Sequence, residues 1–361
     1  MGSNINTRST DDRSVPENEE ALDERLSRPT PAVVADLAGL PPGDLLILGA
    51  GGKMGPSLAR MARRALDAAG QTDRRVVAVA RFSDPAARAL LEAAGVHTHA
   101  ADLSDRAQVA ALPDAGAVIF MAGQKFGTAA APEGTWMMNT YVPALVAERY
   151  APARTPLAAF STGCVYPNTP VARGGSREDD ALEPVGDYAN SCVGRERTLT
   201  YFCRQYGAPL ALIRLNYAVD LRYGVLVDVA RKVRDHEPID LAMGHANVIW
   251  QGDANAYALR ALALAARGDR DSPLALNVTG PETVSIREAA LRLGALLGRS
   301  PAFTGEEADT ALLSNAGRAF SLLGYPSVSL DTLLAWVAAW IGRGGRLLGK
   351  PTHYETRDGR Y

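Results

Sequence analysis

Three glycines spaced three residues apart, Gly49, Gly52 and Gly55, have the spacing of a phosphate-binding loop. A tight turn at Gly49 and the missing side chain of Gly52 would let the backbone approach a pyrophosphate, and Gly55 would let a helix pack closely on a strand. The phosphates would then lie at the positive end of that helix. Because the loop also contains Lys53 and Met54, we interpret it as a dinucleotide-binding segment, with an ordinary glycine-rich turn as the alternative.

The end of the next apolar run favours NADP over NAD as the dinucleotide. An acid at this point would bind the ribose 2′-hydroxyl of NAD, but the run ends in Val79, Ala80 and Arg81. The guanidinium of Arg81 could pair with a 2′-phosphate, and the ammonium of Lys53 could assist it. The alternative is that Arg81 is an ordinary solvent-exposed side chain, which leaves NAD open as the cofactor.

The elements around the glycine loop favour the dinucleotide-binding interpretation over an ordinary glycine-rich turn. Short apolar runs, typical of buried strands, alternate with segments of helical spacing, and the glycine loop lies at the first strand–helix turn. This alternation predicts an α/β fold with a doubly wound parallel sheet of Rossmann type. Strands are expected at 44–49, 75–80, 96–101, 117–122, 157–161 and 210–215, and helices at 56–69, 85–94, 135–150 and 188–206.

After about residue 216 the strand–helix rhythm ends, which predicts a smaller, mainly helical substrate cap. Its helices are expected at 224–234, 254–266, 285–297 and 330–341. We therefore divide the chain into a polar, disordered segment at 1–30, a Rossmann NAD(P)-binding domain at 31–216 to which 245–282 partly returns, a substrate-binding cap at 217–342 and a C-terminal tail at 343–361.

Composition excludes several classes of function. A net charge of -2 gives no electrostatic case for nucleic acid or an anionic membrane as a partner. No apolar run reaches the roughly 18 residues that cross a bilayer, and the polar N-terminal segment lacks the apolar core of a signal peptide. Three cysteines are too few for a disulfide framework, so we expect a cytoplasmic protein. His97 and His99 have no third ligand nearby in the sequence, so no metal site is expected.

Further segments follow the glycine loop in a fixed order. They are Asp102-Leu103, Phe120–Gly123, Asn139, Phe160–Tyr166, Tyr188–Cys192 with Glu196, Arg214–Asn216 and Asn277–Glu282. Together with the loop they resemble the extended short-chain dehydrogenase/reductase family, in its NAD(P)-dependent sugar epimerase/dehydratase group, over about residues 43–342.

The resemblance implies roles for individual residues. Thr162 takes the position of the catalytic Ser/Thr, and Tyr188 takes that of the catalytic tyrosine, which also contacts the cofactor. Asp102 and Leu103 would contact the adenine. The other cofactor-binding residues would be Gly49, Gly52, Lys53, Met54, Gly55, Arg81, Ala122, Gly123 and Asn139, and the substrate would meet Cys164, Asn216, Trp250 and Gln251.

Two departures from the family pattern concern the chemistry directly. The family lysine, four residues after the tyrosine, is Cys192, which supplies no positive charge to lower the tyrosine pKa. Lysine occurs at only four positions, and Lys125 lies in a loop that borders the nicotinamide end in this fold, so it could replace the missing charge or be an ordinary loop residue. Gly163 and Cys164 stand where the dehydratase branch has an acidic pair, which argues against elimination of water.

Two alternatives concern side chains near the expected site. Cys164 and Cys192 could provide a functional thiol or form a reversible disulfide with each other. Alternatively, both are small buried residues that fill space in the core. Trp250 could line the substrate cleft or belong to the core.

These residues leave two classes of function open. The first is an NAD(P)-dependent oxidoreductase or epimerase that acts on a sugar, nucleotide sugar or related carbonyl or hydroxyl compound, with Tyr188 as acid and base. The second is a non-catalytic NADP-binding sensor or scaffold that has lost the catalytic lysine. The retained Thr162 and Tyr188 favour the enzyme. The family further implies a homodimer formed by the expected helices at 135–150 and 188–206.

Overall fold

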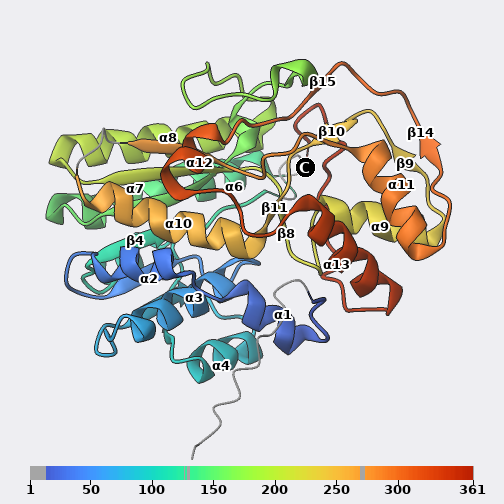
Figure 1. Ribbon diagram of the computed structural model, residues 1–361. Helices are drawn as coiled ribbons and strands as arrows, with labels where there is room; N and C mark the ends of the chain where they lie inside the picture. The colour runs from blue at the N-terminus through green and yellow to red at the C-terminus, as the bar shows by residue number, and fades with distance from the viewer. Residues whose placement is uncertain (1–13, 126, 128–130, 269–272, 361) are drawn as a thin grey trace, which may run out of the picture.

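A seven-stranded parallel sheet forms the centre of the molecule in the computed structural model, which describes residues 14–125, 127, 131–268 and 273–360 (Figure 1). The strand order is β12-β7-β5-β4-β1-β2-β3, and every neighbouring pair is parallel. This confirms the predicted Rossmann-type sheet. Its strands are β1 (Leu45–Leu48), β2 (Val76–Ala80), β3 (His97–Ala100), β4 (Ala117–Phe120), β5 (Leu157–Thr162), β7 (Leu210–Leu215) and β12 (Leu274–Val278).

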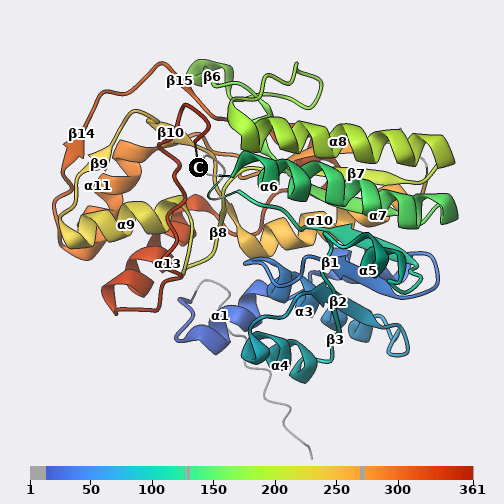
Figure 2. The ribbon, with the colours of Figure 1, turned by 180° about the vertical axis from the view of Figure 1, so that it is seen from behind.

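Helices cover both faces of this sheet, as a parallel sheet requires. The first face is covered by α2 (Pro31–Ala38), α3 (Gly55–Ala68), α10 (Gln251–Ala266) and α12 (Gly317–Leu323). The opposite face, in front in Figure 2, is covered by α5 (Arg106–Ala110), α7 (Val142–Tyr150) and α8 (Gly186–Tyr206). α4 (Pro85–Ala93) packs beside β3. The predicted helix at 135–150 consists of α6 (Pro132–Trp136), one π-helical turn (Met137–Tyr141) and α7.

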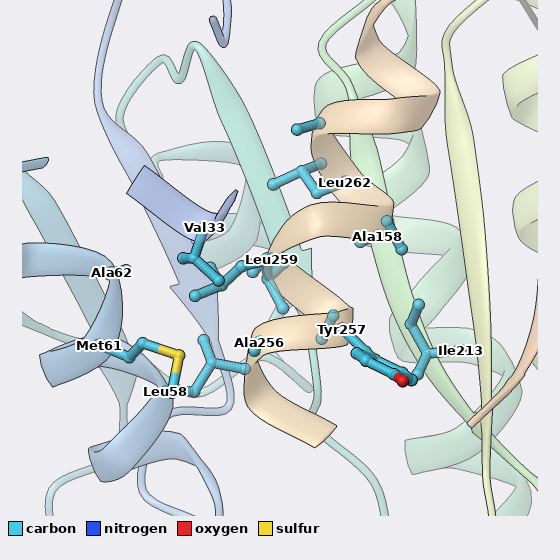
Figure 3. Close-up of a cluster of buried hydrophobic side chains, with 14 of the residues drawn as sticks. Val33, Leu58, Met61, Ala62, Ala158, Ile213, Ala256, Tyr257, Leu259 and Leu262 are labelled. Carbon is cyan, nitrogen blue, oxygen red and sulfur yellow. The ribbon is translucent and has the colours of Figure 1, made fainter. Parts of the chain in front are cut away.

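The core on the first face joins segments that are far apart in the sequence. Figure 3 shows Val33 from α2 and Leu58 and Met61 from α3 packing against Leu259 from α10. All four side chains are fully or almost fully buried. The chain therefore returns from its C-terminal half to complete the dinucleotide-binding part.

A second hydrophobic core holds the smaller, mainly helical part together. Trp250, Trp336 and Trp340 are its largest buried side chains. Its helices are α9 (Val225–Asp235), α11 (Ile286–Leu297) and α13 (Leu330–Gly342). Its short strands are β8 (Ala218–Val219), β9 (Ile239–Asp240), β10 (His245–Ala246), β11 (Ile249–Trp250), β13 (Val284–Ser285) and β14 (Phe303–Thr304), and β15 (Thr310–Ala311) pairs with β6 (Thr169–Pro170).

The N-terminal segment differs from the expectation of disorder over residues 1–30. Residues 1–13 lie outside the described part, but Glu19–Leu26 form helix α1, whose N-cap is the side chain of Asn18. Leu22 and Leu26 are fully buried in the second core. The composition is polar, yet two leucines four residues apart give the helix one apolar face that packs against the rest of the molecule.

Candidate active site

The glycine loop connects β1 to α3, and two of its glycines are required by the fold itself. Gly49 has φ of 90°, and a Cβ at this position would lie 2.5 Å from the backbone nitrogen of Ala122. A Cβ on Gly55 would collide with the backbone of Ala50. A Cβ on Gly52 would make only an ordinary contact within the protein, so the packing of the protein does not itself require glycine here. The missing side chain of Gly52 instead leaves room for a ligand.

The start of α3 fits the pyrophosphate of a dinucleotide. The helix is 14 residues long, and its N-cap residue Met54 makes no side-chain capping bond. Pro56 in the first turn has no N–H, so the backbone N–H groups of Gly55 and Ser57 are the ones available to phosphate oxygens at the positive end of the helix. The contacts of Gly49, Gly52 and Gly55 and this helix end together fit the cofactor that the sequence predicts.

Asn139 fixes the backbone that follows β4. Its Oδ1 accepts a hydrogen bond from the Gln124 nitrogen, and its Nδ2 donates to the Gln124 carbonyl oxygen, both at 2.9 Å. The buried guanidinium of Arg195 donates to the same Oδ1 at 2.7 Å, and a Cβ on Gly123 would lie 2.5 Å from Arg195 Nη2. Asn139 is fully buried, so it supports the predicted cofactor segment Ala122–Gly123 from behind.

Asp102, Leu103 and Arg81 lie at the carboxyl ends of β2 and β3. Asp102 Oδ1 accepts hydrogen bonds from Ser104 N at 2.9 Å and from Ser104 Oγ at 2.7 Å. These bonds, and less strongly the charge of Arg81, lower the pKa of Asp102. Leu103 is buried, and Arg81 is exposed. An exposed guanidinium near the predicted adenosine end is accessible to a 2′-phosphate.

A cavity of about 380 Å³ lies at the carboxyl ends of the central strands. It brings together many residues that are distant in the sequence, which is the usual position of a ligand site in such a sheet. The predicted site residues that line it are Gly52, Lys53, Met54, Gly123, Lys125, Thr162, Cys164, Tyr188, Asn216 and Gln251. Sequence reasoning did not find Tyr217, Tyr223 and Thr352, which also line it.

Tyr188 and Thr162 meet in this cavity, from α8 and the end of β5. Burial raises the pKa of Tyr188 well above its ordinary value, and the neighbouring thiols of Cys192 and Cys164 act in the same direction. The charge of Arg195 and a hydrogen bond with Thr162 oppose that rise. Tyr188 is therefore protonated at neutral pH in the free protein, and a positive charge would be needed to lower its pKa.

Lys125 places an amino group close to the tyrosine. Its Nζ lies 6.0 Å from the centroid of the Tyr188 ring and donates a hydrogen bond to the carbonyl oxygen of Thr352 at 3.3 Å. Burial lowers the pKa of Lys125, and this effect is opposed by Cys164, Cys192 and Asp228.

Cys192 lies behind Tyr188 rather than in the cavity wall. It is fully buried, and burial raises the pKa of its thiol to about 11. Cys164, Cys192 and Cys203 are free thiols, so the structure contains no disulfide between the two cysteines of the motif segments. A neutral, buried thiol cannot supply the charge of the family lysine.

Lys53 places a second lysine in the cavity. Its Nζ lies 3.1 Å from the centroid of the Tyr223 ring. Burial, reinforced by the charges of Lys125 and Lys350, lowers the pKa of Lys53 to about 7. An anionic ligand beside it would stabilise the charged form.

Trp250 does not line this cavity, which corrects its assignment to the substrate cleft. The side chain is 2 % exposed and packs edge to face on Trp336, with centroids 5.3 Å apart. It belongs to the second hydrophobic core. The adjacent Gln251 instead faces the cavity and donates a hydrogen bond to Ser57 Oγ at 3.1 Å. Neighbouring residues point to opposite sides where β11 passes into α10.

The fold and this cavity define a dinucleotide-binding protein of the Rossmann class. Residues 45–221 match the model of the NAD dependent epimerase/dehydratase family. This match over nearly half of the chain confirms the resemblance to that family seen in the sequence, and it supports the prediction of an NAD-dependent enzyme of this type. No curated protein matches the chain significantly.

Solved structures with the same fold include several sugar epimerases. UDP-glucose 4-epimerase from Thermotoga maritima, solved with UDP-glucose, has a TM-score of 0.66 and 16% identity, covering 83% of this chain and 99% of its own. The UDP-Glc/GlcNAc 4-epimerase from Campylobacter jejuni has a TM-score of 0.67 and 20% identity, and the match covers 82% of this chain and 98% of its own. WbmG from Bordetella bronchiseptica, in complex with NAD, has a TM-score of 0.66 and 17% identity, and the match covers 87% of this chain and 96% of its own.

Among the described residues, no helix is long and apolar enough to span a bilayer.

Proposed function

We propose that this protein is an NAD(P)-dependent oxidoreductase or epimerase that acts on a sugar, nucleotide sugar or related carbonyl or hydroxyl compound. The observation that carries the proposal is the meeting of Thr162 and Tyr188 in the cavity that the glycine loop also borders. A hydroxyl pair of this kind can bind one substrate oxygen and exchange a proton with it.

The chain's own residues would divide the work as follows. The glycine loop and the N-terminus of α3 hold the pyrophosphate, and Lys53 adds a positive charge beside it. The bound dinucleotide supplies a nicotinamide that accepts or returns a hydride. Tyr188 moves a proton to or from the reacting oxygen, while Thr162 donates a hydrogen bond that orients that oxygen. Asn216 and Gln251 offer amide groups to neighbouring substrate hydroxyls.

The missing lysine requires another source of positive charge. Lys125 faces the Tyr188 ring at 6.0 Å, and the guanidinium of Arg195 lowers the tyrosine pKa from the buried side. We propose that Lys125, together with the charge of the oxidised nicotinamide, lowers the pKa of Tyr188 in the ternary complex, because opposite charges favour the tyrosinate.

For the cofactor we propose NADP, with NAD as the alternative. The exposed Arg81 at the end of β2 supports NADP, since no acid occupies that position. WbmG, which has a similar fold, is solved in complex with NAD, and this supports NAD as the alternative cofactor. For the substrate, the epimerases of similar fold act on UDP-sugars, and this supports a sugar-like compound.

We further propose a cytoplasmic homodimer. Three free thiols fit a reducing compartment. The face formed by α6, the π-helical turn and α8 exposes Trp136, Tyr141 and Tyr201, with Tyr201 65% exposed. Large exposed aromatic side chains on adjacent helices are typical of a surface that another subunit covers.

The non-catalytic NADP-binding protein remains the second candidate, because Cys192 is a neutral, buried thiol. Mass spectrometry of small molecules that co-purify with the protein, followed by turnover assays with the compounds found, separates the two. The enzyme predicts a change in NADPH absorbance, or a converted sugar, that requires Tyr188. Tight dinucleotide binding with no conversion of any carbonyl or sugar compound would favour the sensor.

A further inference from the structure

The C-terminal segment 350–360 runs past the candidate active site instead of ending at the margin of the molecule. Figures 1 and 2 both show the C-terminus beside β10 and β8, between the sheet and the helices of the smaller part. Thr352 is 1% exposed and lines the cavity. Its carbonyl oxygen accepts the hydrogen bond from Lys125 Nζ at 3.3 Å. The chain thus brings a residue 227 positions away to the proposed catalytic lysine.

One carboxylate fastens Thr352 in place. Asp228 Oδ2, on α9, accepts hydrogen bonds from Thr352 N at 2.8 Å and from Thr352 Oγ1 at 2.6 Å. Burial raises the pKa of Asp228, and the two bonds from Thr352 oppose that rise. These two bonds fix the backbone at Thr352, and its carbonyl oxygen faces Lys125.

Two further contacts fix the segment beyond Thr352. Tyr354 is buried in the second hydrophobic core. The guanidinium of Arg357 donates to the carbonyl oxygens of Ala242 and Thr310 at 3.1 and 2.9 Å, and to Thr310 Oγ1 at 2.6 Å. These buried contacts make the segment an integral, packed part of the structure.

The last residues reach the helix that carries Tyr188. A Cβ on Gly186, the first residue of α8, would lie 2.6 Å from the carbonyl oxygen of Gly359, and Gly186 has φ of 80°. Tyr188 follows two residues later. The segment therefore links the smaller part, the proposed catalytic lysine and the start of the tyrosine helix.

We infer that the C-terminal segment 350–360 forms a wall of the active site and that Thr352 is a positioning residue that holds Lys125 toward Tyr188. The ammonium of a lysine has three donors on a flexible stem. An acceptor that is itself fixed by Asp228 restricts where that stem can place its charge. The effect on turnover rests on the proposed function, whereas the contact itself does not.

The test compares two substitutions at Thr352 in the full-length protein. Thr352→Val keeps the shape but loses the hydroxyl donor to Asp228, and Thr352→Ser keeps that donor. Arg346→Ala is the matched control, because Arg346 lies in the same tail but pairs with Glu19 through Nη2 and Oε2 at 2.5 Å and does not line the cavity.

The first readout needs no substrate. Acetic anhydride labelling, followed by mass spectrometry, reports the reactivity of each of the four lysines, and Lys232 on α9 serves as the internal reference. We expect Thr352→Val to raise the labelling rate of Lys125 by about tenfold, because losing the hydroxyl bond to the Asp228 carboxylate loosens the backbone whose carbonyl oxygen holds Lys125. Thr352→Ser and Arg346→Ala should leave that rate unchanged. Equal Lys125 labelling in all variants would overturn the inference.

The second readout uses whichever substrate is turned over. Thr352→Val should lower kcat by about tenfold and leave the Kd of the dinucleotide unchanged, and Thr352→Ser should restore kcat. A fall in dinucleotide affinity that matches the fall in kcat would instead show a general structural role for Thr352. If no substrate is found for the full-length protein, the proposed function fails while the labelling still decides the inference. Circular dichroism establishes that each variant is folded.

Discussion

At the scale of single residues, the proposed mechanism depends on the hydroxyl of Tyr188. We expect Tyr188→Phe to abolish turnover while the dinucleotide still binds with unchanged affinity, because only the proton-transferring group is removed. Stopped assays for conversion and calorimetry with NADPH measure the two effects. Thr162→Val provides the comparison, since it removes the neighbouring hydroxyl without removing the acid. A Tyr188→Phe protein with full activity would rule out the proposed mechanism.

In the proposed mechanism, Lys125 sets the pH at which Tyr188 exchanges its proton. A charged ammonium on Lys125, 6.0 Å from the ring, would lower the tyrosine pKa, so its removal would raise that pKa. We therefore expect Lys125→Met to shift the limb of the rate–pH profile that reports Tyr188 to higher pH, by about one unit. Lys125→Arg keeps the charge and should keep the limb near its original position. A profile that does not move in Lys125→Met would leave the nicotinamide and Arg195 as the sources of charge.

At the scale of single elements, we expect the loop between β1 and α3 to make dinucleotide binding depend on pH. The pKa of Lys53 is about 7 in the free protein, so the ammonium loses its proton as the pH rises through this value. The pyrophosphate favours the charged form, and binding above pH 7 should therefore take up a proton and weaken with rising pH.

Calorimetry in two buffers of different ionisation enthalpy measures this proton uptake directly. We expect affinity to fall by up to about tenfold between pH 6.5 and 8.5. The Lys53→Met variant should bind the dinucleotide weakly, with an affinity that does not change with pH across this range. Lys232 lies outside the cavity, so the Lys232→Met variant should behave like the unaltered protein. No proton uptake at pH 8 would argue against a phosphate contact by Lys53.

We propose that the end of β2 selects between the two dinucleotides. Arg81 is exposed at this end and has no competing acid beside it in the strand. We expect Arg81→Ala to weaken NADP binding by about tenfold and to leave NAD binding nearly unchanged, because a charged hydrogen bond to the 2′-phosphate is lost. Titration with both dinucleotides gives the ratio. An unchanged ratio would assign the protein to NAD or to an unselective site.

At the scale of the whole molecule, the exposed aromatic face predicts a homodimer. Tyr201 on α8 is 65% exposed and packs edge to face on Phe202 with centroids 5.4 Å apart. We expect light scattering at micromolar concentration to give twice the mass of 38.2 kDa, and Tyr201→Glu to shift the equilibrium toward the monomer. A charge placed in an apolar interface costs more than it does on an open surface. Leu296→Glu, on an exposed position of α11, is the control.

The sequence by itself determined the class of fold and most of the proposed site. The strand–helix alternation predicted the parallel sheet, because a strand covered on both faces is apolar along its whole length, as the fully buried Leu45–Leu48 shows. The spacing of Gly49, Gly52 and Gly55 predicted the loop, because the constraints on a tight turn and a close helix crossing are local. Thr162 and Tyr188 were assigned through the resemblance of short motifs to those of the family.

Only the tertiary structure decided which residues share one cavity. Trp250 and Gln251 are neighbours in the sequence, yet one packs in the core and the other faces the site. No local pattern marks Thr352, which reaches Lys125 across 227 positions through a carbonyl group that every residue possesses. The pKa of Lys53 likewise depends on burial and on the charges of Lys125 and Lys350. Burial and long-range contact arise from the packing of the whole chain, and for this reason the sequence pattern alone did not contain them.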